Sequence, residues 1–217
     1  MNNYKWSLST VFIIALVLSG INPPSGRADW LLENTPIFVA ILVFIPLIRY
    51  IKISDLSFTF IIAYLMFPLV AAHYGVTGVS LGSTIGHFIG TSRNMYDRLT
   101  HFLFGFCAFY PIQEFVMSIH KNAGKNSFWS YYIPFETIVA LSAVYEIFEW
   151  VASITVNPVL RAAFYGSQGD IFDTPEDMAN SIVGALCIML IIFLYQKYGK
   201  NYLNKFRKLD IDPLVKN

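Results

Sequence analysis

Charged residues are scarce in this chain of 217 residues, of which only 13% are Asp, Glu, Lys or Arg. A soluble domain carries about 25% charged residues, so this sequence cannot cover a water-facing surface of ordinary polarity. The net charge is only +1, which excludes the strongly basic surface expected of a nucleic-acid-binding protein. With 55% hydrophobic and 17% aromatic residues, the composition indicates that a lipid bilayer is the solvent for much of the chain.

Cysteine is nearly absent, and the common sequence signatures of metal and nucleotide sites are missing. Cys107 and Cys187 both lie within apolar runs, so we expect small packing residues rather than a disulfide or a metal pair. The sequence has no His-Glu-x-x-His, Cys-x-x-Cys, P-loop or EF-hand pattern. Because it also lacks an internal repeat or a low-complexity linker, it predicts a single integral membrane domain over residues 1–217.

Long apolar runs are the main feature that is present. A helix needs about 20 residues to cross a hydrocarbon core of about 30 Å, and lipid-exposed spans must be helical because lipid cannot satisfy free backbone groups. The runs predict an all-α, polytopic bundle of about six transmembrane helices. The predicted spans are residues 6–21, 36–53, 56–72, 99–119, 131–155 and 178–195.

The first apolar run has a second interpretation. Lys5 followed by a short apolar stretch resembles a signal peptide, with Ser19 and Gly20 as small residues near a cleavage point. The run lacks the Ala-x-Ala end typical of such peptides, which favours a retained helix. The sequence alone leaves open whether this run is retained or cleaved.

The distribution of lysine and arginine predicts the orientation of the helices. Cytoplasmic loops of membrane proteins carry an excess of these residues. With the N-terminus inside, the predicted inner segments hold most of the 15 basic residues, and we expect both termini and the basic tail, residues 196–217, to be cytoplasmic. The inner basic residues are Lys5, Arg49, Lys52, Lys121, Lys125, Lys197, Lys200, Lys205, Arg207, Lys208 and Lys216.

Ionisable residues gather where three predicted helices end at the outer face. Such groups are costly at membrane depth and usually face a bundle interior or a water-filled cavity. Asp97 and His101 are four residues apart and would share a helical face, as Glu146 and Glu149 would with a spacing of three. The sequence therefore predicts that these side chains meet near the outer surface.

The last predicted helix adds a further acidic group at the same face. Asp173 or Thr174 is the expected N-cap, and Asp177 and Asn180 follow along one stripe of the helix. Gly184 continues this stripe and would allow another helix to approach closely. The candidate ligand-binding residues are Arg93, Asn94, Tyr96, Asp97, Arg98, His101, Glu146, Glu149, Asp170, Asp173, Asp177 and Asn180.

Structural roles are the alternative for the same residues. The carboxylates could pair with Arg93, Arg98 or Arg161 in a dry bundle, because a buried charge is normally paired. The glycines between His73 and residue 90 favour a short membrane-surface or re-entrant helix, since three of them recur at every fourth position. Convergence of these side chains around a cavity would favour a functional site, whereas pairing of each acid with an arginine in a dry bundle would favour a structural role.

Three segments resemble the uncharacterised bacterial inner-membrane family typified by YjdF. Residues 93–102 are Arg-Asn-Met-Tyr-Asp-Arg-Leu-Thr-His-Phe, residues 145–150 are Tyr-Glu-Ile-Phe-Glu-Trp, and residues 169–178 begin Gly-Asp and end Asp-Met. The order of these segments and the apolar runs between them also match. The resemblance implies a multi-pass protein of the bacterial inner (plasma) membrane, in a family without an established activity.

A looser resemblance connects the chain to VanZ-like membrane proteins. It rests on Asp97-Arg98 with His101-Phe102, on the later Glu146, and on Asn180 before Gly184-Ala185. Glu176 stands where aspartate is usual in that pattern. These proteins are implicated in envelope and glycopeptide responses, so the resemblance implies a role in the cell envelope.

Binding without catalysis is the first functional hypothesis. An outer-facing pocket would bind an envelope lipid head group or a small ligand, with Arg93, Arg98 and Arg161 contacting phosphate. The lipid bilayer is then a partner, nucleic acid is not, and the sequence leaves the oligomeric state and the ligand undetermined.

An intramembrane hydrolase or transferase acting on a lipid is the second hypothesis. Its catalytic candidates are His101, Glu146, Glu149 and Asp177, by acid/base chemistry or with a metal. No cofactor is assigned, although a divalent cation would suit His101, Glu146, Asp173 and Asp177. A proton- or cation-coupled transporter ranks third, because Glu146 and Glu149 lie in the outer half and no repeat is visible.

Overall fold

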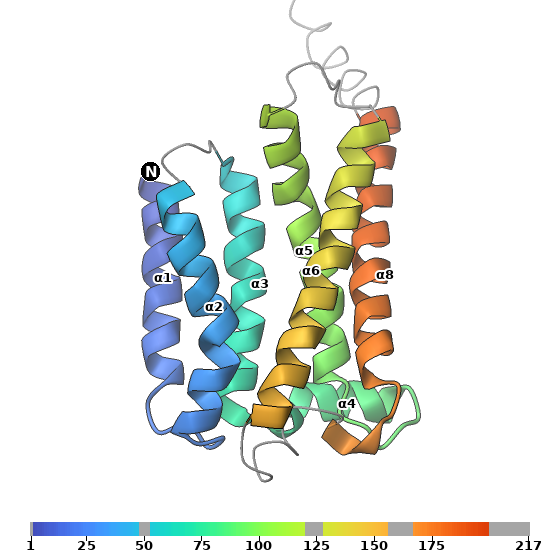
Figure 1. The fold of residues 1–217 in the computed structure, drawn as a ribbon. Helices are drawn as coiled ribbons and strands as arrows, with labels where there is room; N and C mark the ends of the chain where they lie inside the picture. The colour runs from blue at the N-terminus through green and yellow to red at the C-terminus, as the bar shows by residue number, and fades with distance from the viewer. Residues whose placement is uncertain (1, 48–52, 120–127, 156–166, 200–217) are drawn as a thin grey trace, which may run out of the picture.

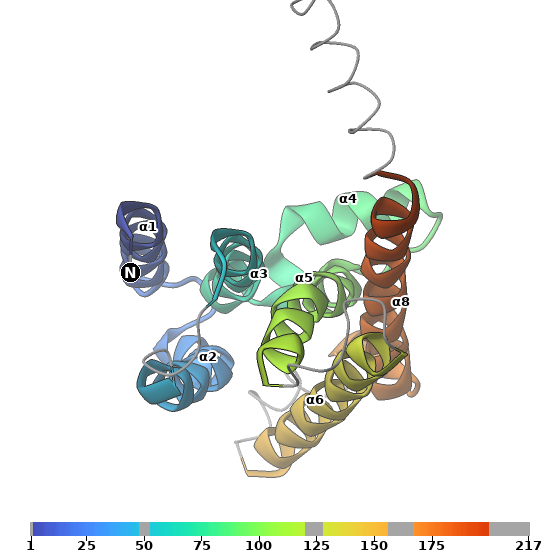
Figure 2. The same cartoon turned by 90° about the horizontal axis from the view of Figure 1, so that it is seen from above.

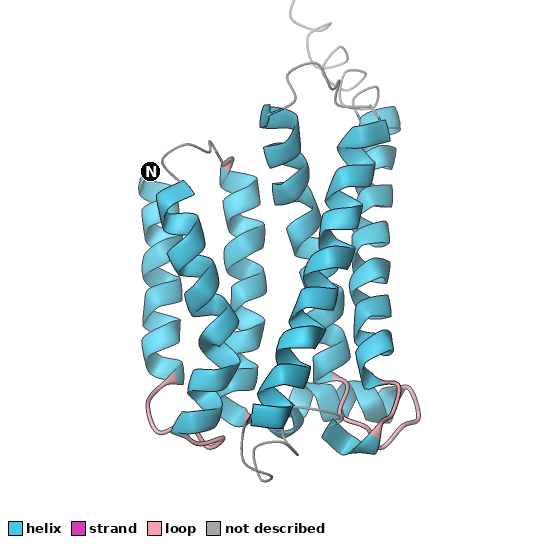
Figure 3. Ribbon diagram, viewed as in Figure 1, coloured by secondary structure: helices cyan, strands magenta, loops and turns pink. Residues whose placement is uncertain are grey.

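The computed structural model describes residues 2–47, 53–119, 128–155 and 167–199, and these are almost entirely helical with no strand among them (Figure 3). The all-α prediction is therefore confirmed. The long helices are α1 (Asn3–Ser19), α2 (Arg27–Leu47), α3 (Asp55–Tyr74), α5 (Tyr96–Ile119), α6 (Phe128–Thr155) and α8 (Asp173–Leu194). The short elements are η1 (Val76–Gly78), α4 (Ser80–Phe88), η2 (Ser167–Gly169) and the π-helical turn η3 (Tyr195–Gly199).

Several of these helices are long and apolar enough to cross a membrane. Within the described residues they are α3, α5, α6 and α8, whereas α1 is a shorter apolar helix. The protein is thus a multi-pass helical bundle, while the count of six spans and the cytoplasmic placement of both termini stay predictions.

Two helices begin before the membrane spans predicted for them, and the predicted N-cap of one of them is wrong. Helix α2 begins at Arg27, ahead of the span predicted from residue 36, and Asp29 lies in its first turn, where the helix dipole favours an acidic group. Helix α8 begins at Asp173, and its N-cap is Phe172 without a side-chain capping bond. Neither Asp173 nor Thr174 is therefore the N-cap, and the Asp173 carboxylate pairs with arginines instead.

The helices form two groups that meet along α3 and α5. In Figures 1 and 2, α1 and α2 pack with α3, and α6 and α8 pack with α5. The first group has a core around Phe12 and Leu69, and the second has one around Phe109 and Ile138. The N-terminus and the C-terminal end of α8 lie at one end of the bundle, and α4 crosses the opposite end (Figure 1).

Glycines bring α5 and α8 into unusually close contact. A Cβ atom on Gly105 would collide with the backbone carbonyl oxygen of Ser181, and one on Gly184 would collide with that of Phe102. Small residues at a crossing let two backbones approach closely in lipid. The predicted role of Gly184 is confirmed, and the crossing holds the polar end of α5 against the polar end of α8.

The glycine-rich stretch forms the short helix α4, while its placement at the membrane surface or as a re-entrant helix stays a prediction. A Cβ on Gly82 would meet the side chain of Asn94, and one on Gly86 would meet the carbonyl oxygen of Arg93. The segment that leads into α5 therefore lies directly on α4, which fixes the position where α5 begins.

Candidate functional site

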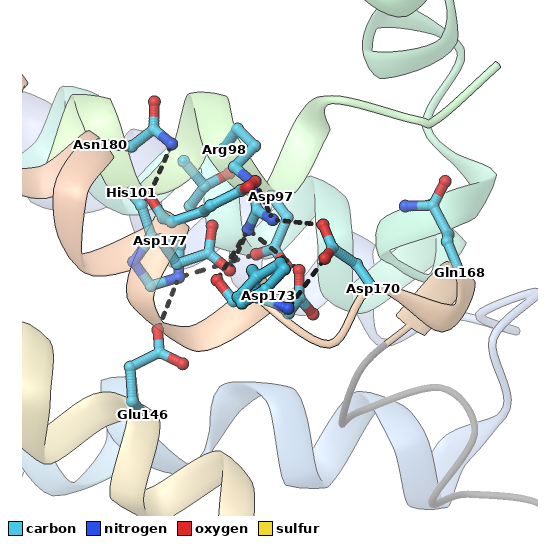
Figure 4. A network of polar contacts seen from close by, with 12 residues as sticks. Asp97, Arg98, His101, Glu146, Gln168, Asp170, Asp173, Asp177 and Asn180 are labelled. Carbon is cyan, nitrogen blue, oxygen red and sulfur yellow. Dashed lines mark hydrogen bonds and ion pairs between the residues drawn. The ribbon is translucent and has the colours of Figure 1, made fainter. Parts of the chain in front are cut away.

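His101 lies at the centre of a polar cluster at the α4 end of the bundle (Figure 4). Its Nε2 atom is 3.5 Å from Oε1 of Glu146 on α6 and 3.7 Å from Oδ1 of Asp97, one turn earlier on α5. Asp177 of α8 completes the group, since one ligand atom each from Asp97, His101 and Asp177 lie within 4.8 Å of one another. Three helices thus contribute to one buried site.

Two carboxylate oxygens in this cluster are buried without a hydrogen bond. Glu146 is 4% exposed and Asp177 is 1% exposed. Oε1 of Glu146 and Oδ1 of Asp177 have no hydrogen-bond partner among the described residues. Burying an unsatisfied polar atom is costly, so these two oxygens are the least satisfied groups of the cluster.

Two serines orient the His101 ring. Oγ of Ser181 lies 3.4 Å from Nδ1 of His101 and donates to the His101 backbone carbonyl at 3.2 Å. Ser142 donates to the same Ser181 oxygen at 3.1 Å. Either atom can donate in the contact between Nδ1 and Ser181, depending on the tautomer of the ring. The other ring nitrogen, Nε2, faces Glu146 and Asp97.

Arg93 and Arg98 form ion pairs with acidic residues in the first turns of α8 and in the loop before it. Arg98 is 4% exposed and reaches across to α8, where it forms a close ion pair with Asp177. It also bonds to the backbone carbonyl of Asp173 at 3.1 Å. The carboxylate partners of the two arginines are Asp170, Asp173, Glu176 and Asp177.

Negative charge exceeds positive charge at this end of the bundle. Six carboxylates face two guanidinium groups, because Asp97 and Glu146 add to the four acidic partners of Arg93 and Arg98. With every carboxylate ionised, the group would carry an excess of four negative charges. In a low-dielectric bundle, such an excess favours binding of a cation.

Other predicted residues serve the architecture. The Asn94 amide donates to the backbone carbonyl oxygens of Thr77 and Val79 and to Ser83. It thereby joins the segment before α5 to η1 and α4. The Tyr96 hydroxyl donates to the carbonyl oxygen of Phe67 at 2.9 Å. These polar groups are fully engaged within the fold.

Two predicted residues form no hydrogen bond or ion pair with His101. Asn180 donates to the carbonyl oxygen of Glu176, one turn back on the same helix. Glu149 lies close enough to Asp97, Glu146 and Asp177 to interact with them electrostatically, but it forms no hydrogen bond or ion pair with the residues that the structure describes. Arg161 lies outside the described residues.

The structure adds residues that the sequence analysis did not select. Ser142 and Ser181 could have been found from helical spacing, because each lies four positions from an acidic residue of the cluster. Gln168 accepts from the Asn94 backbone at 2.7 Å and donates back to it at 3.1 Å. No sequence signal predicts that pair, since 74 positions separate the two residues.

Fold and site together define a class: a polytopic helical membrane protein with a buried histidine–carboxylate cluster at one end of its bundle. The chain belongs to the family described as predicted membrane protein DUF2238, whose model matches residues 4–198. It is also 27% identical over 179 residues to the inner membrane protein YjdF of Escherichia coli strain K12, covering 82% of this chain and 84% of that protein. No solved structure matches.

Proposed function

We propose that this protein binds a divalent metal ion through His101 Nε2 and the carboxylates of Asp97, Asp177 and Glu146. The observation that carries the proposal is the pair of buried, unpartnered oxygens on Glu146 and Asp177, both in the cluster around His101. One imidazole with carboxylates suits Zn²⁺, Mn²⁺ or Fe²⁺. We also propose the bacterial inner membrane as its location, because the Escherichia coli relative is named for that membrane.

Charge balance supports a cation over a phosphate-bearing head group. Two of the three predicted phosphate ligands, Arg93 and Arg98, are already engaged by carboxylates, and Arg98 is buried. A phosphate would have to displace those acids and would add charge of the sign already in excess. A divalent cation reduces the excess and satisfies the unpartnered oxygens at once.

The serine pair supports a metal ligand at His101. Metal-binding histidines usually have the second ring nitrogen hydrogen-bonded, which fixes the tautomer and the ring orientation. Here Ser181 occupies that position, with Ser142 behind it. Nε2 faces the carboxylates of Glu146 and Asp97, so its lone pair would coordinate a metal ion held among them in the tautomer protonated at Nδ1.

Metal-dependent hydrolysis is a second candidate function, favoured by Glu146. This carboxylate comes from α6, whereas the other three groups come from α5 and α8. A bound metal ion could polarise a substrate oxygen and supply hydroxide. Glu146 would then serve as the base that accepts the water proton rather than as a ligand.

The proposal is tested by metal analysis of the purified full-length protein. After loading with Zn²⁺ or Mn²⁺ and removal of excess ion, we expect one bound metal per chain in the parent and loss of binding in His101→Ala and Asp177→Asn. Glu146→Gln separates the two candidate roles of Glu146. If Glu146 is a metal ligand, the variant loses the metal. If Glu146 is the catalytic base, the variant keeps it.

A matched control lies on the same helix as Glu146. Glu136 is exposed on α6, and Glu136→Gln should keep the metal content of the parent. Elution profiles in detergent confirm that each variant is folded. A folded parent that holds no metal after loading, or His101→Ala with unchanged metal content, contradicts the proposal.

A further inference from the structure

An apolar groove runs between α6 and α8 at the end of the bundle opposite to His101. It is an open groove with a volume of about 500 Å³, within the range of about 300–1,000 Å³ that is typical of ligand sites. It is lined by Phe128, Tyr131, Tyr132, Phe135, Leu186, Met189, Leu190 and Phe193. Apart from the two tyrosine hydroxyls, these side chains offer apolar surface, so the groove suits a hydrocarbon chain.

A smaller polar cavity adjoins this groove. It has a volume of about 190 Å³ and is lined by Tyr131, Phe193, Gln196 and Lys197. Tyr131 and Phe193 line both cavities, so the two form one continuous groove with an apolar body and a polar mouth. A groove with an apolar part and a polar end suits an amphipathic ligand.

The polar mouth carries a positive charge without a counter-ion. The Lys197 ammonium lies 5.8 Å from the ring centre of Phe193 and 5.2 Å from that of Tyr198. Lys197 is exposed and forms no ion pair with the described part of the chain. Two aromatic faces therefore hold a cation beside the groove, where it remains available to an anionic ligand.

A neighbouring amide adds a hydrogen-bond donor. The Tyr131 hydroxyl donates to Oε1 of Gln196 at 2.7 Å, which fixes the orientation of that amide. Its Nε2 group donates to none of the described residues and is free to contact an oxygen of a ligand. The mouth thus offers one cation and one amide donor, the groups that bind a phosphate oxygen.

We propose that this groove binds an anionic phospholipid, with an acyl chain among the aromatic side chains and the phosphate at Lys197 and Gln196. Charge argues for this occupant, because the chain beyond the groove continues with Lys200, Lys205, Arg207 and Lys208. Basic segments next to a membrane helix attract anionic lipids, with about 1 kcal/mol for each Lys or Arg near the surface. The acyl chain of a zwitterionic lipid would fill the apolar part of the groove equally well. Its head group carries no net charge, so its attraction to Lys197 would be weaker.

Native mass spectrometry of the full-length protein in detergent tests the proposal. Phosphatidylglycerol and phosphatidylcholine with identical acyl chains are added at equal concentration. The parent should retain phosphatidylglycerol in preference to phosphatidylcholine. Lys197→Gln should reduce that preference by about fivefold, which is the effect of one basic residue near an anionic surface.

Two further variants separate the head group from the acyl chain. Arg27→Gln removes an equal charge at an exposed position at the other end of the bundle and should leave the preference unchanged. Leu190→Trp fills the apolar body and should reduce retention of both lipids. Equal retention of the two lipids by the parent, or a preference that Lys197→Gln does not alter, overturns the proposal.

Discussion

At the polar end of the bundle under α4, some side chains hold the helices together through ion pairs, and others keep a polar atom without a hydrogen bond. Arg98 is the main organiser, because its buried guanidinium bonds to α8 and to the loop before it. Glu146 and Asp177 each keep an oxygen without a partner. Because the arginines are engaged by other carboxylates, the proposed metal site rests on His101 and on the carboxylates around it.

Ser181 should tune metal binding without contacting the metal. Ser181→Ala removes the hydrogen bond that orients the His101 ring, so we expect metal affinity to fall by about 10–100-fold, as for other groups that support a metal ligand. Competition with a chelating dye measures the change. Ser118→Ala is the control, since Ser118 is exposed on α5 and bonds only to the local carbonyl of Phe115. Equal affinity of Ser181→Ala and the parent would contradict the assigned role.

The crossing of α5 and α8 is the helix contact on which the site depends. Gly105 and Gly184 allow backbone-to-backbone approach, and the resulting distance sets Asp97 and His101 against Asp177 and Ser181. Helix α6 adds Glu146 from the third side. The site is therefore a product of helix packing rather than of any one segment.

Adding a single methyl group at this crossing should destabilise the bundle. Gly105→Ala places a Cβ against the Ser181 carbonyl oxygen, and overpacking of this kind costs about 1–3 kcal/mol. Alanine has the higher helix propensity, so a loss of stability reports packing alone. Unfolding in detergent measures the change, with Gly78→Ala as the control, because its Cβ would meet only ordinary contacts. A Gly105→Ala protein as stable as the parent would show that the crossing can relax.

At the scale of the whole molecule, the bundle has two chemically different ends. One end carries the buried acidic cluster under α4, and the other carries the groove with Lys197 and both described chain ends (Figure 1). The positive-inside rule predicts that the lysine end faces the cytoplasm. The proposed metal site would then lie near the extracytoplasmic surface.

Cysteine labelling of intact cells tests this orientation. Thr84 on α4 and Ser118 near the other end of α5 are both exposed. With Cys107 and Cys187 replaced by alanine, Thr84→Cys should react with a membrane-impermeant maleimide in intact cells. Ser118→Cys should react only after permeabilisation, and the reverse pattern would show that the bundle is inverted.

Sequence alone determined the class of this protein and much of its site. Scarcity of charge and the long apolar runs required lipid as solvent and helices as the spanning structure, because a hydrocarbon core cannot satisfy free backbone groups. Helical spacing predicted that Asp97 and His101 share a face. The family assignment followed from three short segments whose order persists along the chain, and the family model confirms it.

Tertiary structure decided which charges are engaged and which remain free. Glu146 and Glu149 are three positions apart, yet only Glu146 reaches His101, because three residues on a helix still differ by about 60° in direction. The engagement of Arg98 by α8 depends on a crossing between segments more than 70 positions apart. Such long-range contacts leave no periodic signal in one sequence, so packing alone separated the ion pairs that build the fold from the buried carboxylate oxygens without a hydrogen bond.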